Sequence, residues 1–384
     1  MRVCITINAE AKTNALIARI TNALEHGNYN IRLVTRNRFI NEKGNVKLLK
    51  YKTMQNEVSN YEIRLYSELG RGLLNLFQLV YYQFLLFKWL LRHKKEYDII
   101  HAVDLDTGFP TLILSKLVKK KYVYHIADFY VDSRGGIPKL LKNIIKKLEF
   151  LVINNAETTV ICTEERRSQI KGSKPKNLVV MHNTPIPVEM KNNNTFVINN
   201  SNLKSNITIA YVGALGEKRF IKNAINVIKK YPEISLNIAG LGKMEKIVEE
   251  ASKNYININY YGQVDYETAL KIYSISDVMF AIYDPNVPNH KYSAPNKVYE
   301  AMFLGKPIIV AKDTGIDQIV KNNEMGIVIN YTEEAFEKAL SVILSNPEKI
   351  KQTGENAKKA YNIYSWEKMR DLLVKVYKDI NPSF

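Results

Sequence analysis

The chain has 384 residues, 46% of them hydrophobic, and a formal net charge of +17. A chain of this length exceeds what one hydrophobic core usually serves, so two domains are expected. The charge is uneven, because residues 1–200 hold 31 Lys and Arg against 17 Asp and Glu. Such a surface favours an anionic partner, and the sign alone does not distinguish nucleic acid, phospholipid headgroups and a phosphorylated substrate.

The two cysteines, Cys4 and Cys162, each lie in an apolar run typical of a buried strand. This placement argues against a disulfide framework and a metal cluster, and it fits a reducing cytoplasm. The first apolar run is too short for the core of a secretory signal, so we expect a cytoplasmic protein.

The first half alternates short apolar runs with amphipathic stretches. The runs VCITI, IRLVTR, DIIHAV, KYVYHIA and TTVICT are typical of strands, and helical patterns separate them. This alternation predicts βαβ units around a parallel sheet. We expect a Rossmann-like domain over residues 1–185, then an Asn- and Ser-rich linker over 186–206.

The same alternation of apolar runs and helical patterns begins again after the linker. Apolar runs such as ITIAYVG, ISLNIAGLG, DVMFAIY and KPIIVA alternate with helical patterns over residues 207–363. These features predict a second open α/β domain, and the last helical pattern, 364–384, is expected to pack back on the first. Ligands of open α/β sheets bind at the carboxyl ends of the strands, so the site is predicted in a cleft where the two domains face each other.

A single acid, Glu300, stands in an otherwise apolar helical stretch, SAPNKVYEAMFLGKP, which Gly305 ends. One interpretation is a surface acid on an amphipathic helix. The other is a carboxylate that accepts hydrogen bonds from sugar hydroxyls, as acids do on ribose in nucleotide-binding α/β domains.

Glycine turns follow several predicted strands of the second half. Glycines let backbone amides approach a phosphate, and an adjacent Arg adds bidentate contacts. One such turn is a weak signal, but three in one sheet are stronger. They contain Gly213 and Gly216 with Lys218 and Arg219, then Gly240 and Gly242, then Thr314 and Gly315.

The second half of the chain resembles the C-terminal half of the family 4 (group 1) glycosyltransferases. The resemblance rests on four segments in this order: YVGALGEKRF, NIAGLGKMEKIVEEA, YYGQVDYETALKIYSISDVMFAIYDP and SAPNKVYEAMFLGKPIIVAKDTG. EYDIIHAVDLDTGFPTLILSKL and VVMHNTPIP are similar to the N-terminal domain of a bacterial branch concerned with surface polysaccharides. The resemblance implies the GT-B arrangement of two facing Rossmann-like domains. It also implies retaining transfer of a sugar from a nucleotide-diphosphate donor to a hydroxyl, without metal or cofactor.

The resemblance also implies roles for single residues. Glu300 matches the acid that holds the donor ribose. The basic groups that neutralise the diphosphate are matched by Arg219, with Lys218 and Lys297. The other donor-side positions are Gly213, Gly240, Gly262, Val264, Tyr292, Asn296, Thr314 and Gly315.

Two positions depart from the family pattern. Many members carry a second acid eight positions before the ribose acid, where this chain has Tyr292. Many also have an arginine after the first glycine, where this chain has Ala214. The first departure leaves sugar recognition to local substitutes, His290, Lys291 or Tyr292, and the second leaves the phosphate charge to Arg219.

Polar residues also gather after two predicted strands of the first half, where they are expected to line the acceptor side of the cleft. The competing interpretation of each is a turn cap or a satisfied surface group. Asp128 is the preferred cleft residue, for the acceptor or the donor sugar, and with Arg219 and Lys297 it forms the set of catalytic candidates. The acceptor-side candidates are His101, Asp104, Asp106, His125 and Asp128. Their spacing matches no familiar metal-ligand motif.

Two apolar or basic stretches bear on membrane contact. Residues 73–91 are apolar but interrupted by polar residues, which favours a packed domain helix over a spanning one. Residues 137–152 set leucines and isoleucines against lysines, which is either a solvated lysine face or a basic amphipathic helix on an anionic membrane surface. The second alternative suits a lipid-linked acceptor and a peripheral position on the inner face of the cell membrane.

Two other functions remain open. A nucleotide-sugar epimerase of the same fold would bind the same donor without an acceptor. A nucleic-acid-binding protein would use the basic charge, but its basic residues should interleave with aromatics, whereas these lysines lie among Leu and Ile. We therefore expect a nucleotide sugar and a glycan or lipid-linked acceptor as partners, and no nucleic acid.

Overall fold

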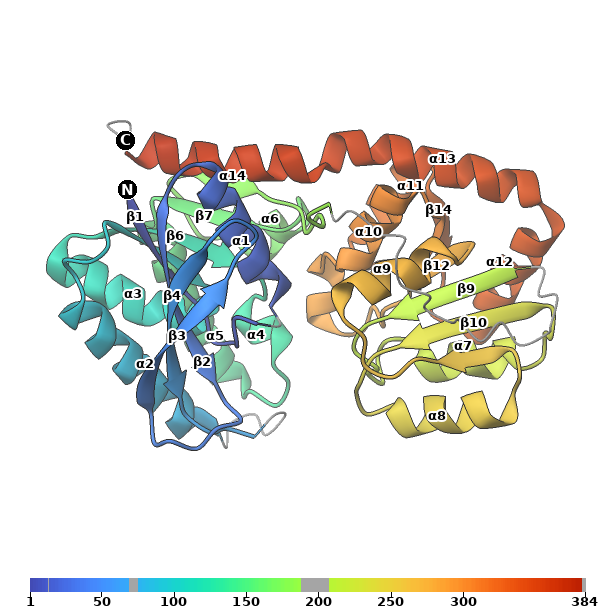
Figure 1. The fold of residues 1–384 in the computed structure, drawn as a ribbon, viewed down its shortest axis with the longest axis horizontal. Helices are drawn as coiled ribbons and strands as arrows, with labels where there is room; N and C mark the ends of the chain where they lie inside the picture. Colours follow the sequence, from blue (N-terminus) through green and yellow to red (C-terminus); the bar gives the residue numbers. More distant parts are fainter. Residues whose placement is uncertain (13, 69–74, 188–206, 382–384) are drawn as a thin grey trace. The chain divides into compact units, whose positions relative to one another are not determined.

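A computed structural model describes residues 1–12, 14–68, 75–187 and 207–381 of the chain. The chain divides into two compact units (Figure 1): unit 1 comprises Met1–His182 with Glu367–Phe384, and unit 2 comprises Asn183–Trp366. Each unit has its own sheet and its own hydrophobic core. Most of the linker predicted over 186–206 lies outside the described residues, which omit 188–206.

Unit 1 is built on an eight-stranded sheet of order β3-β4-β2-β1-β5-β6-β7-β8. All neighbouring strands run parallel except β3 and β4, which pair antiparallel at one edge. The strands are β1 (Arg2–Thr6), β2 (Asn30–Asn37), β3 (Asn45–Lys52), β4 (Glu57–Arg64), β5 (Ile99–Val103), β6 (Lys121–Ile126), β7 (Thr158–Ile161) and β8 (Leu178–Val180).

The helices of unit 1 flank this sheet. Helices α2, α3 and α5 pack in a row, and their apolar side chains share a core with the buried residues of β5 and β6. The helices are α1 (Ala15–His26), α2 (Leu76–Arg92), α3 (Asp104–Val118), α4 (Tyr130–Ser133), α5 (Lys139–Asn155), α6 (Arg166–Gln169) and the C-terminal α14 (Trp366–Ile380).

Unit 2 has a fully parallel six-stranded sheet of order β11-β10-β9-β12-β13-β14. The strands are β9 (Ile207–Val212), β10 (Ile234–Ala239), β11 (Ile258–Tyr260), β12 (Val278–Ala281), β13 (Ile308–Ala311) and β14 (Gly326–Ile329). The helices are α7 (Ile221–Ile228), α8 (Glu245–Asn254), α9 (Tyr266–Ser274), α10 (Asn296–Leu304), α11 (Ile316–Asn322), α12 (Glu333–Ser345) and α13 (Pro347–Tyr364), with a short 3₁₀ turn, η2 (Pro288–Tyr292).

These two sheets confirm the prediction of two open, mostly parallel α/β units. In each unit, β-strands with helical crossovers bring turns from distant parts of the sequence to one edge of the sheet, at the carboxyl ends of the strands. The predicted site residues of both units follow such ends, so the fold determines which of them can meet.

Within the described ranges, no helix is both long and apolar enough to cross a bilayer. The stretch predicted over 73–91 forms α2 from Leu76 onward, and residues 73 and 74 lie outside the described part. One side of α2 buries Tyr82 and Trp89 in the core, while Phe77 on the other side is 87% exposed. The helix is therefore packed, as expected of a domain helix, and also presents apolar side chains to solvent.

Candidate active site

Three glycine turns meet at the carboxyl edge of the unit 2 sheet. The amide of Gly213, directly after β9, donates to Ala239 O at 3.0 Å, and the amide of Gly240, after β10, donates to Gly262 O at 2.7 Å. A Cβ added to Gly240 would lie 1.8 Å from Gly213 O, and its φ is +133°. Only glycine allows this approach, so the turns form one continuous backbone surface.

Helix α10 brings a lysine and an acid to this surface. Lys297 is only 9% exposed, and its Nζ lies 4.5 Å from the centre of the Tyr211 ring and would be 2.7 Å from a Cβ on Gly213. Burial alone would lower the pKa of Lys297, but the Tyr211 and Tyr283 hydroxyls and Glu300 more than offset this and raise it. Lys297 is therefore a charged ammonium held against the first glycine turn.

Glu300 lies three residues after Lys297 on α10, hence on the same side of the helix. It is 6% exposed, so the interpretation as a solvent-exposed surface acid is wrong. Gly305 ends the helix with φ +66°. Helix α10 thus holds a buried cation and a buried carboxylate beside one another at the glycine turns.

Arg219 and Lys218 differ in what they contact. The Arg219 guanidinium stacks on the Tyr283 ring, with Cζ 3.7 Å from its centre, whereas Lys218 Nζ forms an ion pair with Asp284 Oδ2 at 3.0 Å. Burial alone would raise the pKa of Asp284, but hydrogen bonds from Asn286 and Lys218 outweigh it and lower the pKa. Arg219 is stacked in place, while Lys218 is engaged by a carboxylate that the sequence analysis did not single out.

The sequence offered a signal for Asp284: an acid that comes soon after the buried strand β12, in the run VMFAIYDP. The loop around it is closely bonded, because the His290 Nδ1–H donates to the Asp284 carbonyl at 2.8 Å. The ring of His290 is buried and lies against Tyr283. Of the three local substitutes for the missing sugar-binding acid, Lys291 is exposed and Tyr292 partly so.

The loop after β13 corrects one expectation. The Thr314 side chain is fully buried, and its hydroxyl donates to Ala311 O at 2.6 Å, so it is not available to a ligand. Gly315 follows with φ +75° and precedes α11. Val264 and Asn296 are partly exposed. At Thr314, therefore, the backbone but not the side chain can contact a donor.

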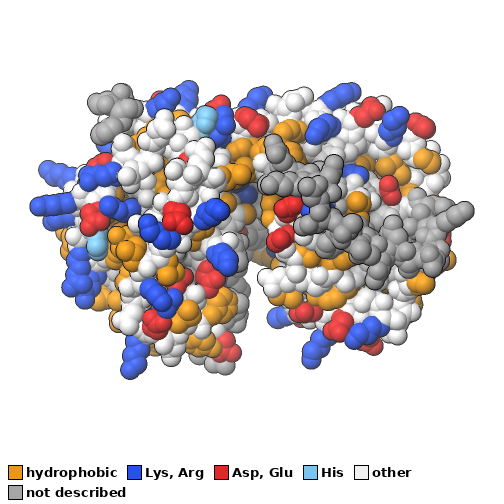
Figure 2. Space-filling view, viewed as in Figure 1, with side chains coloured by type: hydrophobic (Ala, Val, Ile, Leu, Met, Phe, Trp, Pro, Cys, Tyr) orange, Lys and Arg blue, Asp and Glu red, His pale blue; other side chains and the backbone are white. Residues whose placement is uncertain are grey.

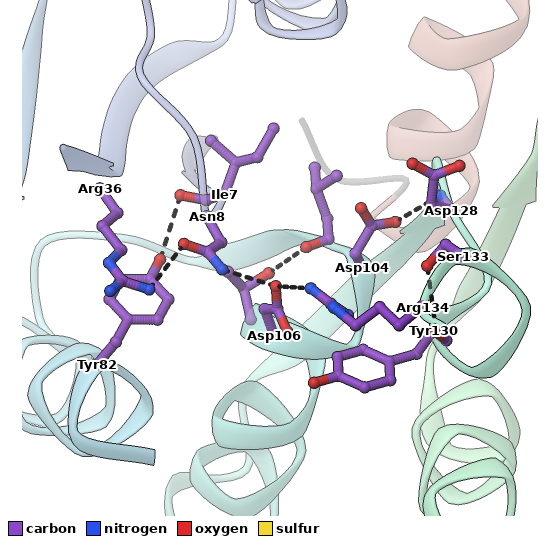
Figure 3. Close-up of polar contacts among 12 residues, drawn as sticks. Ile7, Asn8, Arg36, Tyr82, Asp104, Asp106, Asp128, Tyr130, Ser133 and Arg134 are labelled. Carbon is purple, nitrogen blue, oxygen red and sulfur yellow. Dashed lines mark hydrogen bonds and ion pairs between the residues drawn. The ribbon is translucent and has the colours of Figure 1, made fainter. Parts of the chain in front are cut away.

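In unit 1, Asp104 and Asp128 face each other across the ends of β5 and β6 (Figure 3). Asp104 has φ +57° and its Oδ1 accepts hydrogen bonds from the amides of Ala127 (2.8 Å) and Asp128 (3.0 Å). Burial, and then the charge of Asp128, raises the pKa of Asp104 to about 7. Arg166 Nη2 lies 3.8 Å from Asp128 Oδ1, and the Asp128 side chain is 57% exposed. Asp104 therefore caps the β6 turn and presents Asp128 beside it.

The two histidines predicted to line a cleft are buried instead. His101 Nδ1 and the Tyr377 hydroxyl of α14 are joined by a 2.6 Å hydrogen bond, and His101 Nε2 lies 3.2 Å from His125 Nδ1. Burial lowers the pKa of both, that of His101 to about 3. The expectation for these residues is corrected: both are buried, and His101 bonds Tyr377 of α14 on one side and His125 on the other.

Asp106 joins a cluster that sequence analysis missed (Figure 3). Its Oδ2 accepts hydrogen bonds from Asn8 Nδ2 at 2.6 Å and Arg134 Nη2 at 2.9 Å. Asn8 follows β1 and Arg134 follows α4, so no local pattern connects them. In the described residues, no three His, Cys, Asp or Glu side chains are grouped to hold a metal ion.

Residues 192–360 match the family model described as Glycosyl transferases group 1. The chain is 25% identical over 303 residues to an uncharacterized glycosyltransferase of Methanocaldococcus jannaschii, covering 74% of this chain and 75% of that one. It is also 25% identical over 292 residues to an uncharacterized glycosyltransferase of Haemophilus influenzae, covering 72% and 77%.

Two solved structures have the same fold along essentially the whole chain. Sucrose-phosphate synthase from Thermosynechococcus elongatus matches with a TM-score of 0.75 at 14% identity, covering 100% of both chains. Anabaena HepE in complex with UDP and glucose matches with a TM-score of 0.70 at 13% identity, covering 99% of this chain and 100% of that one. At such identities the likeness establishes the fold, which is GT-B.

Proposed function

We propose that this chain, which has the GT-B fold, is a group 1 glycosyltransferase, and that it is a retaining, metal-independent enzyme that uses a nucleotide-diphosphate sugar. Unit 2 would bind the donor, and unit 1 would bind a glycan or lipid-linked acceptor through one of its hydroxyls. The role proposed for it is cell-surface polysaccharide synthesis.

The observation that carries the proposal is the position of Lys297 against the Gly213 turn. The buried ammonium of Lys297, the guanidinium of Arg219 stacked on Tyr283 and the backbone of the glycine turns lie at one edge of the sheet. Diphosphate oxygens fit such a set of donors. Glu300, buried one turn further along α10, would then accept hydrogen bonds from the ribose hydroxyls.

The chemistry follows from the leaving group. Departure of a nucleoside diphosphate builds negative charge on the diphosphate and oxocarbenium character on the sugar, so cations fixed in advance near the diphosphate lower the barrier. Lys297 and Arg219 would supply this stabilisation. Same-face attack, in which the departing phosphate oxygen takes the acceptor proton, needs no protein nucleophile, and Asp128 would orient the acceptor hydroxyl.

The test begins with donor binding. Thermal stability of the full chain is measured with UDP, GDP, ADP and CMP, beside Glu300→Gln and the matched control Glu267→Gln, an exposed acid of unit 2 paired with Lys271. UDP is the first choice, because HepE is described in complex with UDP and with UDP-glucose. Stabilisation by one diphosphate that is lost only in Glu300→Gln supports the donor site, and no shift with any nucleotide contradicts it.

Turnover tests the rest of the proposal. With the selected nucleotide sugar, a transferase releases the nucleoside diphosphate as it glycosylates an acceptor, whereas an epimerase of the same fold changes the sugar and releases none. Product anomeric configuration by NMR tests retention. Activity that survives a chelator and gains nothing from added Mg²⁺ or Mn²⁺ supports metal independence; activity abolished by the chelator overturns it.

Membrane association is proposed from the surface of unit 1. Helix α5 exposes Leu140 and Ile144 among Lys139 and Lys142, and Figure 2 shows many Lys and Arg side chains on the visible face of unit 1. An apolar and basic face of this kind suits the anionic inner face of a cell membrane. Sedimentation with vesicles containing anionic lipid, compared with neutral vesicles, tests this; equal or absent binding to both contradicts it.

A further inference from the structure

Three arginines of unit 1, Arg36, Arg38 and Arg134, converge on one amide and one carboxylate, and Figure 3 labels the first and the last of them. Arg36 Nη1 donates to Asn8 Oδ1 at 3.3 Å, and Arg38 Nη2 donates to the same oxygen at 3.4 Å. Asn8 in turn donates to Asp106, which also accepts the bond from Arg134. The three arginines come from the end of β2 and from the segment after α4, and they share a single carboxylate.

Arg36 is the least compensated of these charges. It is only 3% exposed, and in the part of the chain that the structure describes no carboxylate oxygen lies within 4.0 Å of its guanidinium. Its Nε donates to Leu65 O at 3.2 Å, its Cζ lies 5.1 Å from the centre of the Tyr82 ring, and its Nη2 makes no hydrogen bond there. A buried cation without a counter-ion is costly, so this region holds an excess of positive charge.

Asp106 has an unused oxygen at the same place. The residue is 4% exposed, and among the described residues no group donates to its Oδ1, although Oδ2 accepts two bonds. A buried carboxylate oxygen without a donor favours a hydroxyl, which can donate to it. The cluster therefore combines an excess of cations with an acceptor for a hydroxyl group.

Arg134 is held so that it can present its remaining donors. Its Cζ lies 3.7 Å from the centre of the Tyr130 ring, Nη2 is fixed by Asp106, and the side chain stays 37% exposed. Gly135 and Gly136 follow, and nothing lies within 4 Å of where their side chains would be. A stacked, partly exposed guanidinium is suited to bidentate binding of phosphate or carboxylate.

We propose, building on the transferase function above, that the acceptor of unit 1 carries an anionic group, phosphate or carboxylate, which Arg38 and Arg134 bind beside Asn8 and Asp106. Arg36 lies behind Asn8 and adds positive potential without touching the ligand. An acceptor hydroxyl next to the anionic group donates to Asp106.

Nearby acids do not cancel this potential. Asp132 accepts a 2.7 Å bond from Gln169, and Asp128 pairs with Arg166. Asp104 has its Oδ1 occupied by two backbone amides, and its raised pKa keeps part of its population neutral near pH 7. The anionic group would therefore meet arginines whose carboxylate neighbours, apart from Asp106, are bound elsewhere.

The test measures binding of small sugars to the full chain by calorimetry, with the donor site saturated by the nucleoside diphosphate selected above. The probes are glucose, glucose 6-phosphate, glucose 1-phosphate and glucuronic acid. At least one anionic sugar is expected to bind about tenfold or more tightly than glucose, and increasingly weakly as salt rises. Comparison of the phosphates with glucuronic acid identifies which anion the site prefers.

Variants locate the effect. Arg134→Gln and Arg38→Gln are each expected to weaken binding of the anionic sugar by about ten- to hundredfold while leaving glucose unchanged, and Arg134→Lys should fall between. The control is Arg167→Gln, an exposed arginine of unit 1 paired with Glu164. Binding of no anionic sugar, equal affinity for glucose, or equal losses in Arg167→Gln would overturn the proposal.

The results distinguish failure of the proposed transferase function from failure of the acceptor inference. If no nucleoside diphosphate binds unit 2, the transferase function is wrong whatever the sugars do. If a diphosphate binds normally to wild type and to Arg134→Gln but anionic sugars show no preference, only the acceptor inference is wrong.

Discussion

The approach of the two glycine turns gives a substitution whose effect can be worked out from the structure. In Gly240→Ala the new Cβ would lie 1.8 Å from Gly213 O and 2.8 Å from Gly213 C, which are backbone atoms that cannot rotate away. The turns after β9 and β10 would have to separate by about 1 Å or more, and overpacking of this kind costs about 1–3 kcal/mol. The φ of +133° lies beyond the left-handed helical region, in backbone space that is almost confined to glycine, and adds about 1–3 kcal/mol for a residue with a Cβ.

We therefore expect Gly240→Ala to destabilise unit 2 by roughly 2–6 kcal/mol. It should also abolish nucleotide binding, because the Gly213 turn, against which Lys297 lies, is displaced. Two other glycines separate the causes. Gly262→Ala has φ +64° and open space around the Cβ, so only the backbone cost of about 1–2 kcal/mol applies. Gly216→Ala has no positive φ and meets Arg219 Cγ at an ordinary 3.4 Å, so it should be nearly neutral.

Urea denaturation of the three variants and thermal shift with the selected nucleotide measure both quantities. Stability should fall in the order Gly216→Ala, Gly262→Ala, Gly240→Ala, with the nucleotide shift lost only in the last. A Gly240→Ala protein that matches Gly262→Ala in stability and still binds the nucleotide would refute the steric reasoning.

Three further predictions concern single side chains. Lys297→Met should weaken binding of the nucleoside diphosphate, measured by calorimetry, by about ten- to hundredfold. Binding of the monophosphate should weaken less, and equal losses for the two nucleotides would contradict a diphosphate contact. Burial raises the pKa of Glu149 from 4.5 to about 8, so the folded state keeps a proton that the unfolded chain loses, and unit 1 should lose stability as pH rises through this window. Melting curves of Glu149→Gln should show a shallower fall, and an unchanged slope would count against this. Tyr377→Phe removes the hydrogen bond to His101, which contributes about 0.5–1.5 kcal/mol of stability. Hydrogen exchange of the α14 amides should therefore become faster, and unaltered exchange would contradict an anchoring role.

The glycine turns and the isolated acid of the proposed donor side were visible in the sequence because their signals are local. A glycine directly after an apolar run identified the turns at Gly213 and Gly240, and an acid isolated among apolar residues identified Glu300. The alternation of short apolar runs with helical patterns also predicted the two mostly parallel sheets. These features depend on backbone geometry, which neighbouring residues in the sequence determine.

The predictions that needed correction depend on contacts between distant segments. Lys218 was expected on a phosphate, but Asp284, from the loop after β12, pairs with it. The Thr314 hydroxyl turns back to its own loop. His101 was expected in a cleft, but α14 covers it with Tyr377, which lies far along the chain. No periodicity in a single sequence carries such pairings.

The two units use different chemistry at corresponding edges of their sheets. In unit 2 the proposed surface for the diphosphate is mostly backbone, formed by the turns of Gly213 and Gly240, which leave no room for a Cβ on Gly240, with Lys297 against them. In unit 1 the positive charge sits on arginine side chains: Arg36 and Arg38 approach Asn8 from the end of β2, and Arg134 approaches Asp106 from the segment after α4. Backbone turns cannot change without disturbing the sheet, whereas side chains can. Acceptor preference should therefore be changeable through Arg38 and Arg134 while the nucleotide affinity of unit 2 stays constant.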